Sequence, residues 1–368
     1  MLITRIEELR LVDPNHAFDS IDGIQGFIDN SEHGFLEDKL GTPLYEALCQ
    51  WYDENPNNRS SFADYQTGYW NRLLLLAQRC VGFDALGCAA GMQGLSFNNA
   101  GINVSIASDY PKADEKEKEI YRNTAFKGAM KSCEIMLAEL ERWASLAAAL
   151  EESSSSDNLE KNASPSDLIE IVTLWRQSRY YYLAASMLIP SFVVLQQYMD
   201  FLESREKFIR MLPDLRFIQE EVIANAIGEE YLDHLINVSL KKAGDAQPIT
   251  TKSPLELRII HQLRRVMVAW LGSRTSVLKY TKEEKIAFHD DGVRKMQDAC
   301  EFIQQHQSDL IESYAEDADA LAAFKASPLY VEEASVPAKE QDTASCACAK
   351  EPDASKSKEA ACWTPPLL

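Results

Sequence analysis

The sequence predicts a mainly α-helical fold, a tandem duplication of one helical domain in which each copy has a short N-terminal strand and about four to five helices. Three observations lead to this prediction. Apolar residues recur at intervals of three, four and seven along most of the 368-residue chain, as on one face of a helix. Polar or glycine-containing breaks separate these runs. The order of the runs in the first half then returns in the second half.

The first copy is expected to open with a strand that runs into a turn of helix at residues 2–14. The amphipathic helix that follows carries its apolar residues on one face, namely Ile21, Ile24, Ile28, Phe35 and Leu36. Gly41 ends this helix, because glycine adopts the left-handed backbone of a helix stop without a steric penalty. Pro43 fits the first turn of the next helix. Gly41 is therefore a predicted structural hinge between two helices.

Two long helices complete the first domain, which we assign to residues 1–150. An apolar helix is expected from residue 69 to residue 90, and a second helix from residue 117 to residue 150. Between them, glycine and asparagine surround the short alternating run of Ile102, Val104 and Ile106. This pattern favours a short strand or hairpin near residues 102–106.

A polar linker and an aromatic helix lead to the second copy. Residues 151–167 are rich in serine and too poor in apolar residues to order themselves, so we assign them as a linker. An aromatic-rich connecting helix is expected at residues 168–187 and the second helical repeat at residues 188–330. The helices of this repeat are expected at residues 206–226, 229–241, 254–280 and 282–306. Residues 335–368 are expected to form a disordered tail.

The duplication is indicated by residues that recur at one offset. Gly41 and Gly228, the second predicted hinge, lie 187 positions apart. Apolar residues of the flanking helices pair at the same offset: Ile21 with Phe208, Ile24 with Met211, Ile28 with Leu215, Leu36 with Ile223, and Leu40 with Ile227. The alternative is chance, since any two amphipathic helices share apolar spacing. The shared order of strand, helix, glycine and further helices favours a true duplication.

The charge of the chain argues against nucleic acid and membranes as main partners. The sequence has 37 Lys and Arg against 57 Asp and Glu, a formal net charge of −20, which repels phosphate backbones and anionic lipid surfaces. The most membrane-like segment, residues 180–199, contains Pro190, so we expect a buried helix followed by a proline-started strand. No secretory leader is evident, so reduced thiols in the cytoplasm are expected.

No motif in the sequence predicts an enzyme, a cofactor or a metal. A phosphate loop, a paired-histidine zinc motif and a nucleophile elbow are all lacking. His289 lies beside Asp290, but neighbouring residues point in different directions around a helix, so a solvated face is the better interpretation. Cys346, Cys348 and Cys362 suggest metal capture or disulfide formation in the tail, but matching ligands are missing. We therefore predict no catalytic residues.

Two aromatic segments are candidate partner contacts. The first includes Trp175, Tyr180 and Tyr181, which we interpret as a groove for a peptide or a helix. The second lies in the tail, where Trp363 precedes two prolines. The restricted backbone of such a segment lowers the entropy cost of docking.

Four stretches of the sequence resemble a known protein family. They read MLITRIEELR, FIDNSEHGFLEDKLGTPLYEAL, NNAGI and KSCEIMLAELE. Together they look like an uncharacterised family found in Bacteroidota and in their prophages and phages, over residues 1–329. Members of that family are similar in layout to the small helical head–tail connector proteins of tailed phages, whose copies assemble into a ring beneath the portal.

The resemblance implies a function in virion assembly. It implies a non-enzymatic structural protein of a phage or prophage, a head–tail connector or assembly adaptor that acts through oligomer contacts. The implied partners are other copies of the chain and virion proteins such as portal or tail components, and the implied location is the cytoplasm of a bacterial host or the virion. The alternative is an intracellular scaffold or regulatory protein-binding module of a bacterial cell. The long linker and the cysteine-bearing tail are departures from the connector layout.

Overall fold

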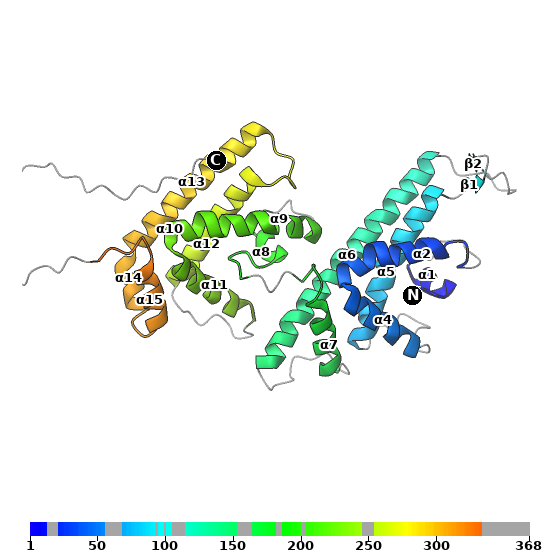
Figure 1. Cartoon of the computed structure of the whole chain (residues 1–368), viewed down its shortest axis with the longest axis horizontal. Helices are drawn as coiled ribbons and strands as arrows, with labels where there is room; N and C mark the ends of the chain where they lie inside the picture. Colours follow the sequence, from blue (N-terminus) through cyan, green and yellow to red (C-terminus); the bar gives the residue numbers. More distant parts are fainter. Residues whose placement is uncertain are drawn as a thin grey trace, which may run out of the picture. The chain divides into compact units, whose positions relative to one another are not determined.

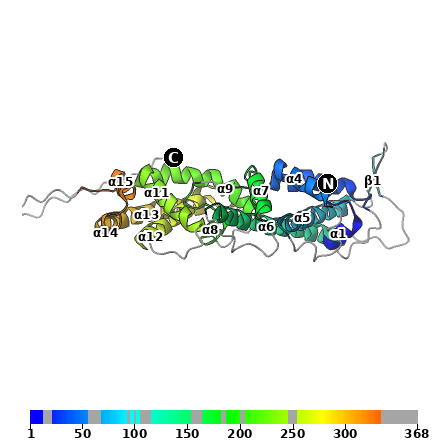
Figure 2. The same ribbon diagram turned by 90° about the horizontal axis from the view of Figure 1, so that it is seen from below.

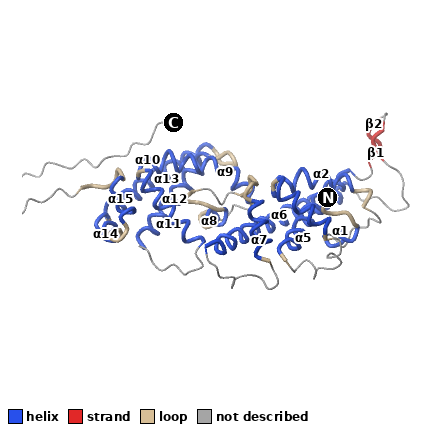
Figure 3. Tube along the Cα trace, turned by 60° about the horizontal axis from the view of Figure 1, so that its bottom comes forward, coloured by secondary structure: helices blue, strands red, loops and turns tan. Residues whose placement is uncertain are grey.

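The computed structural model describes residues 1–12, 21–55, 68–92, 95–98, 101–104, 115–152, 164–181, 186–199, 204–244 and 254–332. Helices make up nearly all the regular structure in these ranges, drawn in blue in Figure 3, which confirms the predicted mainly α-helical fold. Most of the predicted linker and the whole predicted tail lie outside the described residues. Cys346, Cys348, Cys362 and Trp363 lie outside them as well.

The contacts divide the chain into two compact units. Unit 1 comprises residues 1–185 with the short segments 204–209 and 243–246. Unit 2 comprises residues 186–203, 210–242 and 247–368. Unit 1 is therefore not continuous in sequence, because a segment that follows residue 203 completes it. We describe each unit by itself.

Unit 1 consists of helices and one hairpin. In chain order its elements are α1 (Ile6–Val12), α2 (Gln25–Ser31), the π-helical turn η1 (Glu32–Leu36), α3 (Glu37–Leu40), α4 (Thr42–Glu54), α5 (Tyr69–Met92), β1 (Leu95–Asn98), β2 (Gly101–Val104), α6 (Glu115–Glu152) and α7 (Pro165–Trp175). The segments α2, η1 and α3 follow one another without a break, so they form the single amphipathic helix that the sequence predicts before Gly41.

The core of unit 1 is organised around α5 and α6, which run side by side in Figures 1 and 2. Each helix offers a glycine to an aromatic ring of the other: a Cβ added at Gly87 would lie 2.9 Å from Phe126, and one added at Gly128 would lie 3.0 Å from Phe83. Trp143, one of two fully buried tryptophans among the described residues, lies on α6. Close helix packing therefore depends on matched glycine and aromatic positions.

One helix of the described part of the chain, α5, is long and apolar enough to cross a bilayer. Its most apolar window is 72% buried inside the protein. Burial of this kind is what a core helix requires. The segment that the sequence analysis singled out as most membrane-like, residues 180–199, is not such a helix, because its described part contains only the short α8 (Phe192–Gln196).

The hairpin is the only β-structure in the described residues. β1 and β2 pair antiparallel, with Leu95 opposite Val104 and Asn98 opposite Gly101. They bond only to each other in a two-stranded sheet, drawn in red in Figure 3. The sequence places a strand or hairpin near residues 102–106, and residues 105 and 106 lie outside the described ranges.

All the regular elements in the described residues of unit 2 are helices. Its elements are α8, α9 (Arg205–Phe217), the π-helical turn η3 (Ile218–Ile223), α10 (Ala224–Ile227), α11 (Glu229–Gly244), α12 (Pro254–Arg274), α13 (Lys282–Gln305), α14 (Gln307–Ser313) and α15 (Ala318–Ala326), with the first turn of α9 grouped with unit 1. The long helices α12 and α13 lie side by side (Figure 1). A Cβ added at Gly272 would lie 2.6 Å from Phe288, and one added at Gly292 would lie 2.7 Å from Trp270.

Three local predictions need correction. The N-terminal strands are not observed: residues 1–4 and 186–190 form no strand, and helices follow them. The proline-started strand is instead α8, whose N-cap Ser191 accepts a hydrogen bond from the Val194 amide. The aromatic helix ends at Trp175, because the Ser178 side chain bonds the backbone of Lys39 and of Tyr180 and redirects the chain.

Candidate functional site

Both predicted hinges are helix stops with a positive φ. Gly41 has φ 80° and ψ 147°, and Gly228 has φ 91° and ψ 142°. Each follows a π-helical turn and four residues of α-helix, since η1 and α3 precede Gly41 and η3 and α10 precede Gly228. Side chains other than glycine rarely adopt this backbone region. At both positions the helix therefore ends at the glycine that the sequence indicates.

A serine seals each glycine stop. The Ser178 hydroxyl donates to the Lys39 carbonyl over 2.9 Å and accepts from the Tyr180 amide over 3.1 Å. In unit 2 the Ser327 hydroxyl donates to the Ile227 carbonyl over 2.5 Å and accepts from the Leu329 amide over 3.2 Å. Each hydroxyl satisfies a carbonyl in the last turn of the helix before the glycine.

Side chains hold the backbone of Leu2 where the sequence predicts a strand. The Leu2 amide donates to Glu32 Oε1 over 2.7 Å, and the Leu2 carbonyl accepts from Gln78 Nε2 over 2.7 Å. Glu32 is only 1% exposed and also accepts from the Tyr45 hydroxyl over 2.9 Å. A buried backbone group needs a partner, and these side chains supply what a neighbouring strand would supply.

The same arrangement holds Leu188 in unit 2. Its amide donates to Gln219 Oε1 over 2.9 Å, and its carbonyl accepts from Arg264 Nε over 2.6 Å. Arg264 also donates to the Ser239 hydroxyl over 2.6 Å. In both units one partner lies in the π-helical turn and the other in the following long helix, α5 or α12.

A half-buried carboxylate on α5, Asp84, is expected to make the stability of unit 1 depend on pH. Burial raises the pKa of Asp84, and the hydrogen bond from the Ser31 hydroxyl, 2.7 Å long, opposes this effect. Folding therefore favours the neutral carboxyl group. The resulting stabilisation is present below the ordinary pKa of 3.8 and is lost as the pH rises through the folded value.

Replacing Asp84 with asparagine is accordingly expected to raise the melting temperature at pH 7, because the amide keeps an acceptor for Ser31 and carries no charge. The gain should disappear in melts recorded near pH 3. The exposed Asp53, changed to asparagine, is the control and should leave the melting temperature unchanged. An equal gain for Asp84→Asn at both pH values would contradict the role assigned to its charge.

The predicted aromatic contact residues lie in the core of unit 1. Trp175 is 0% exposed and Tyr180 is 1% exposed. The Tyr181 ring is half-buried and packs edge-on against Trp175, with ring centroids 5.2 Å apart. The Lys39 ammonium lies 4.5 Å from the centre of the Tyr180 ring. These rings hold α7 and the segment after it in place, so they form no groove for a peptide.

The described residues show no metal cluster. Among them, no three His, Cys, Asp or Glu side chains gather where they could hold a metal ion. His289 lies 3.4 Å from Asp290 and packs against the ring of Trp270 on the surface of α13 and α12. Burial raises the pKa of Cys300 to about 11, which lowers the fraction of reactive thiolate at neutral pH.

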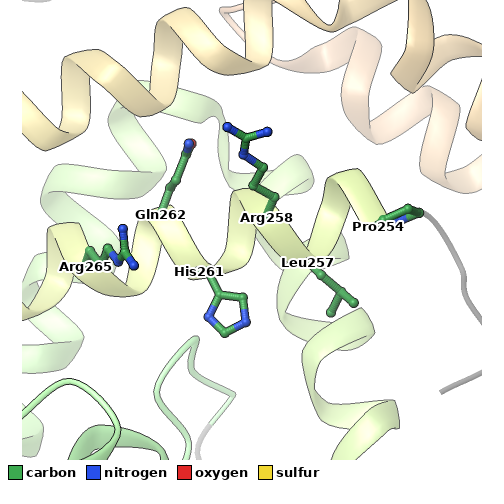
Figure 4. A pocket seen from close by; sticks show the side chains of 6 residues that line it. All are labelled: Pro254, Leu257, Arg258, His261, Gln262 and Arg265. Carbon is green, nitrogen blue, oxygen red and sulfur yellow. The ribbon is translucent and has the colours of Figure 1, made fainter. Parts of the chain in front are cut away.

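The strongest candidate site is a basic groove along α12. Two adjoining cavities of about 550 and 560 Å³ share His261 and Arg265. The first is lined by Pro254, Leu257, Arg258, His261, Gln262 and Arg265, and the second by Gln197, Tyr198, His261, Arg265, Val268 and Lys295. Figure 4 views this face of α12: Arg258 and Gln262 point toward its upper edge, and Leu257 and His261 point toward its lower edge. We call this surface the α12 groove.

The electrostatic environment of the α12 groove is positive. Burial and the charges of Arg264 and Arg265 lower the pKa of His261, and no carboxylate offsets them. The His261 ring lies 2.5 Å from the Tyr198 hydroxyl. Gln262 Oε1 is buried and has no hydrogen-bond partner in the described part of the chain. The groove thus presents positive charge and an unsatisfied polar atom on a chain with a net charge of −20.

Sequence reasoning missed this groove, although a signal exists. Arg258, His261 and Arg265 are spaced by three and four residues and therefore share one face of a helix. The net charge of −20 describes the whole chain and gives no sign of this local basic face.

Comparison with known proteins adds no assignment: no protein-family model, no curated protein and no solved structure matches this chain.

Proposed function

We propose that this protein is a non-enzymatic assembly component, a duplicated helical adaptor that works through contacts with further copies of itself and with other components of a larger particle. A phage or prophage head–tail connector, with portal or tail proteins as partners, is the particular form of this proposal. The cytoplasm of a bacterial host or the virion is the location that goes with it.

Internal repetition supports the duplicated design. Gly41 and Gly228, Glu32 and Gln219, and Phe83 and Trp270 are each 187 positions apart. Gly41 and Gly228 are glycine stops, and the side chains of Glu32 and Gln219 each accept a hydrogen bond from a leucine amide. The rings of Phe83 and Trp270 each pack on a glycine. Chance similarity between amphipathic helices reproduces apolar spacing but does not reproduce side-chain bonds to a chosen backbone group.

The observation that carries the assembly role is the isolated hairpin. An isolated two-stranded hairpin is marginally stable in water, and an unpaired strand edge is a template for another chain. Among the described residues, β1 and β2 have no partner beyond each other. A second copy or a partner strand that pairs with this edge would supply the missing backbone bonds.

Several exposed apolar side chains on α6 also support the assembly role. Ile120 is 57% exposed, Ile135 is 45% exposed and Met130 is 36% exposed. Single exposed apolar residues are common, but several along one helix increase the area that an assembly contact can bury. The second function considered from the sequence, a scaffold with an aromatic peptide groove, is less well supported, because the rings of Trp175 and Tyr180 are buried.

We expect the purified protein to form a discrete oligomer, measured by sedimentation velocity over a wide range of concentration. Replacing residues 95–104 with a Gly/Ser segment of the same length is expected to shift the protein to smaller species, while the helical circular dichroism and the melting curve stay unchanged. A Gly/Ser replacement of residues 153–162 is the matched control. A wild-type protein that sediments as a sharp monomer at every concentration would overturn the assembly role.

A further inference from the structure

We infer that the α12 groove binds the acidic surface of α14 and α15 on a second copy of this chain. The contact is heterologous, since two different surfaces of the protein meet. It deepens the proposed function and rests on it, because it names the interface through which copies associate. Four steps lead to this inference.

The first step is the charge of the groove. Arg258, His261 and Arg265 are exposed, and Arg258 and Arg265 have no ion pair among the described residues. The guanidinium of Arg258 lies 4.5 Å from the centre of the Phe302 ring, which holds its position without neutralising it. Lys295 is bonded to Asp291, so it contributes less. The groove is therefore a local cationic surface fixed on a rigid helix.

The second step is the apolar part of the lining. Pro254 and Leu257 border the first cavity, and Val268 borders the second. A groove that mixes apolar and cationic groups suits a helix surface with both acidic and apolar side chains. The buried Gln262 Oε1 requires a donor, which a polar side chain or amide of such a helix supplies.

The third step is the complementary surface. Asp309, Glu312, Glu316, Asp317 and Asp319 are all exposed on α14, on α15 and between them. No Lys or Arg occurs between residues 296 and 324. Asp309, Glu312, Glu316 and Asp319 have no ion pair among the described residues. This surface, which we call the acidic face, therefore carries four carboxylates that form no ion pair with the described part of the chain.

The fourth step is the fixed position of the acidic face within unit 2. Tyr314 packs against Phe324, and its hydroxyl lies 3.4 Å from that of Tyr231 on α11. Ser327, directly after α15, donates to the Ile227 carbonyl. These bonds fix α14 and α15 on α10 and α11. Because Arg258 and Arg265 form no ion pair with any described residue of their own chain, we assign the groove to the acidic face of another copy.

A heterologous contact of this kind has a geometric consequence. Each copy offers one groove and one acidic face, so copies join head to tail, and the assembly closes into a ring if the rotation allows. Nucleic acid is the competing anionic ligand. The net charge of −20 repels it at long range, which favours a protein partner.

The test reverses the charges on each side separately. In sedimentation velocity at low salt, Arg258→Glu/Arg265→Glu and Asp309→Lys/Glu312→Lys/Glu316→Lys are each expected to weaken association by about 10-fold or more, because like charges then face each other. A chain with both sets reversed should recover association. Lys279→Glu/Lys282→Glu, at exposed positions of unit 2, matches the change in net charge of the first variant and should associate like the wild type.

A direct binding measurement separates this interface from the assembly role. Fluorescence anisotropy follows a labelled peptide of residues 307–326 titrated with the full chain, and the expected result is saturable binding that the groove variant loses. If the peptide binds but the protein stays monomeric, the groove does bind the acidic face and the assembly role is refuted. If oligomers survive both charge reversals and the peptide does not bind, the assembly role stands and the assignment of the groove as the interface is refuted. A labelled DNA duplex that binds through Arg258 and Arg265 in place of the peptide would overturn the inference in favour of nucleic acid.

Discussion

Replacing Arg205 with alanine is expected to destabilise unit 1 by about 3–5 kcal/mol, because it removes a buried guanidinium that forms ion pairs with two poorly exposed carboxylates. Arg205 Nε lies 2.6 Å from Glu141 Oε1, and its NH1 lies 2.8 Å from Glu134 Oε2. The Arg205 side chain is only 9% exposed, and those of Glu134 and Glu141 are 20% and 11% exposed. Hydrogen exchange of peptides from α6 is the measurement, because it reports on unit 1 alone.

Two variants define the origin of this loss. Arg122→Ala, at an exposed position of α6 in unit 1, is the matched control and should change the free energy of unfolding by no more than about 0.5 kcal/mol. The triple variant Arg205→Met/Glu134→Gln/Glu141→Gln should recover much of the stability, since no charge is then left unpaired. If Arg205→Ala behaves like Arg122→Ala, the buried ion pairs do not support unit 1.

Gly41→Ala and Gly228→Ala are each expected to destabilise their own unit by about 1–3 kcal/mol, from the positive φ alone. Crowding adds to this loss. A Cβ at Gly41 would lie 3.1 Å from the Ser178 backbone, and one at Gly228 would lie 3.0 Å from Pro328. Urea denaturation followed by circular dichroism and by hydrogen exchange measures the loss in each unit.

Gly34→Ala is the control for both glycine variants. Gly34 lies in η1, its φ is not positive, and a Cβ there would meet nothing within 4 Å. This variant should be neutral or slightly stabilising, because alanine has less conformational freedom to lose than glycine. Similar losses for Gly34→Ala and Gly41→Ala would show that the helix stop does not depend on backbone conformation.

The sequence predicted the long helices and the two helix stops well. The helices α5, α6, α12 and α13 follow from apolar periodicity, which is a local property of the chain. Gly41 and Gly228 follow from a local backbone requirement as well. Such features can be read directly, because residues close in sequence determine them.

The features that sequence reasoning missed depend on distant residues. The predicted N-terminal strand became a segment whose Leu2 backbone is held by Glu32 and Gln78, 30 and 76 positions away. Hydrophobic pattern cannot distinguish an aromatic residue of the core from one at a contact surface, so Trp175 and Tyr180 were assigned to the wrong environment. Within the α12 groove, the basic spacing was readable, but the cavities beside it depend on packing with α13 and with residues near α8.

The discontinuity of unit 1 affects how the chain folds during synthesis. The helices up to α7 leave the ribosome first, but Glu134 and Glu141 cannot form their ion pairs with Arg205 until that residue has been made. At about 5–20 residues per second, this delay from residue 141 lasts roughly 3 to 13 seconds. During that interval unit 1 lacks the ion pairs that Arg205 makes with α6, so the nascent protein is expected to remain only partly consolidated until translation has passed residue 209.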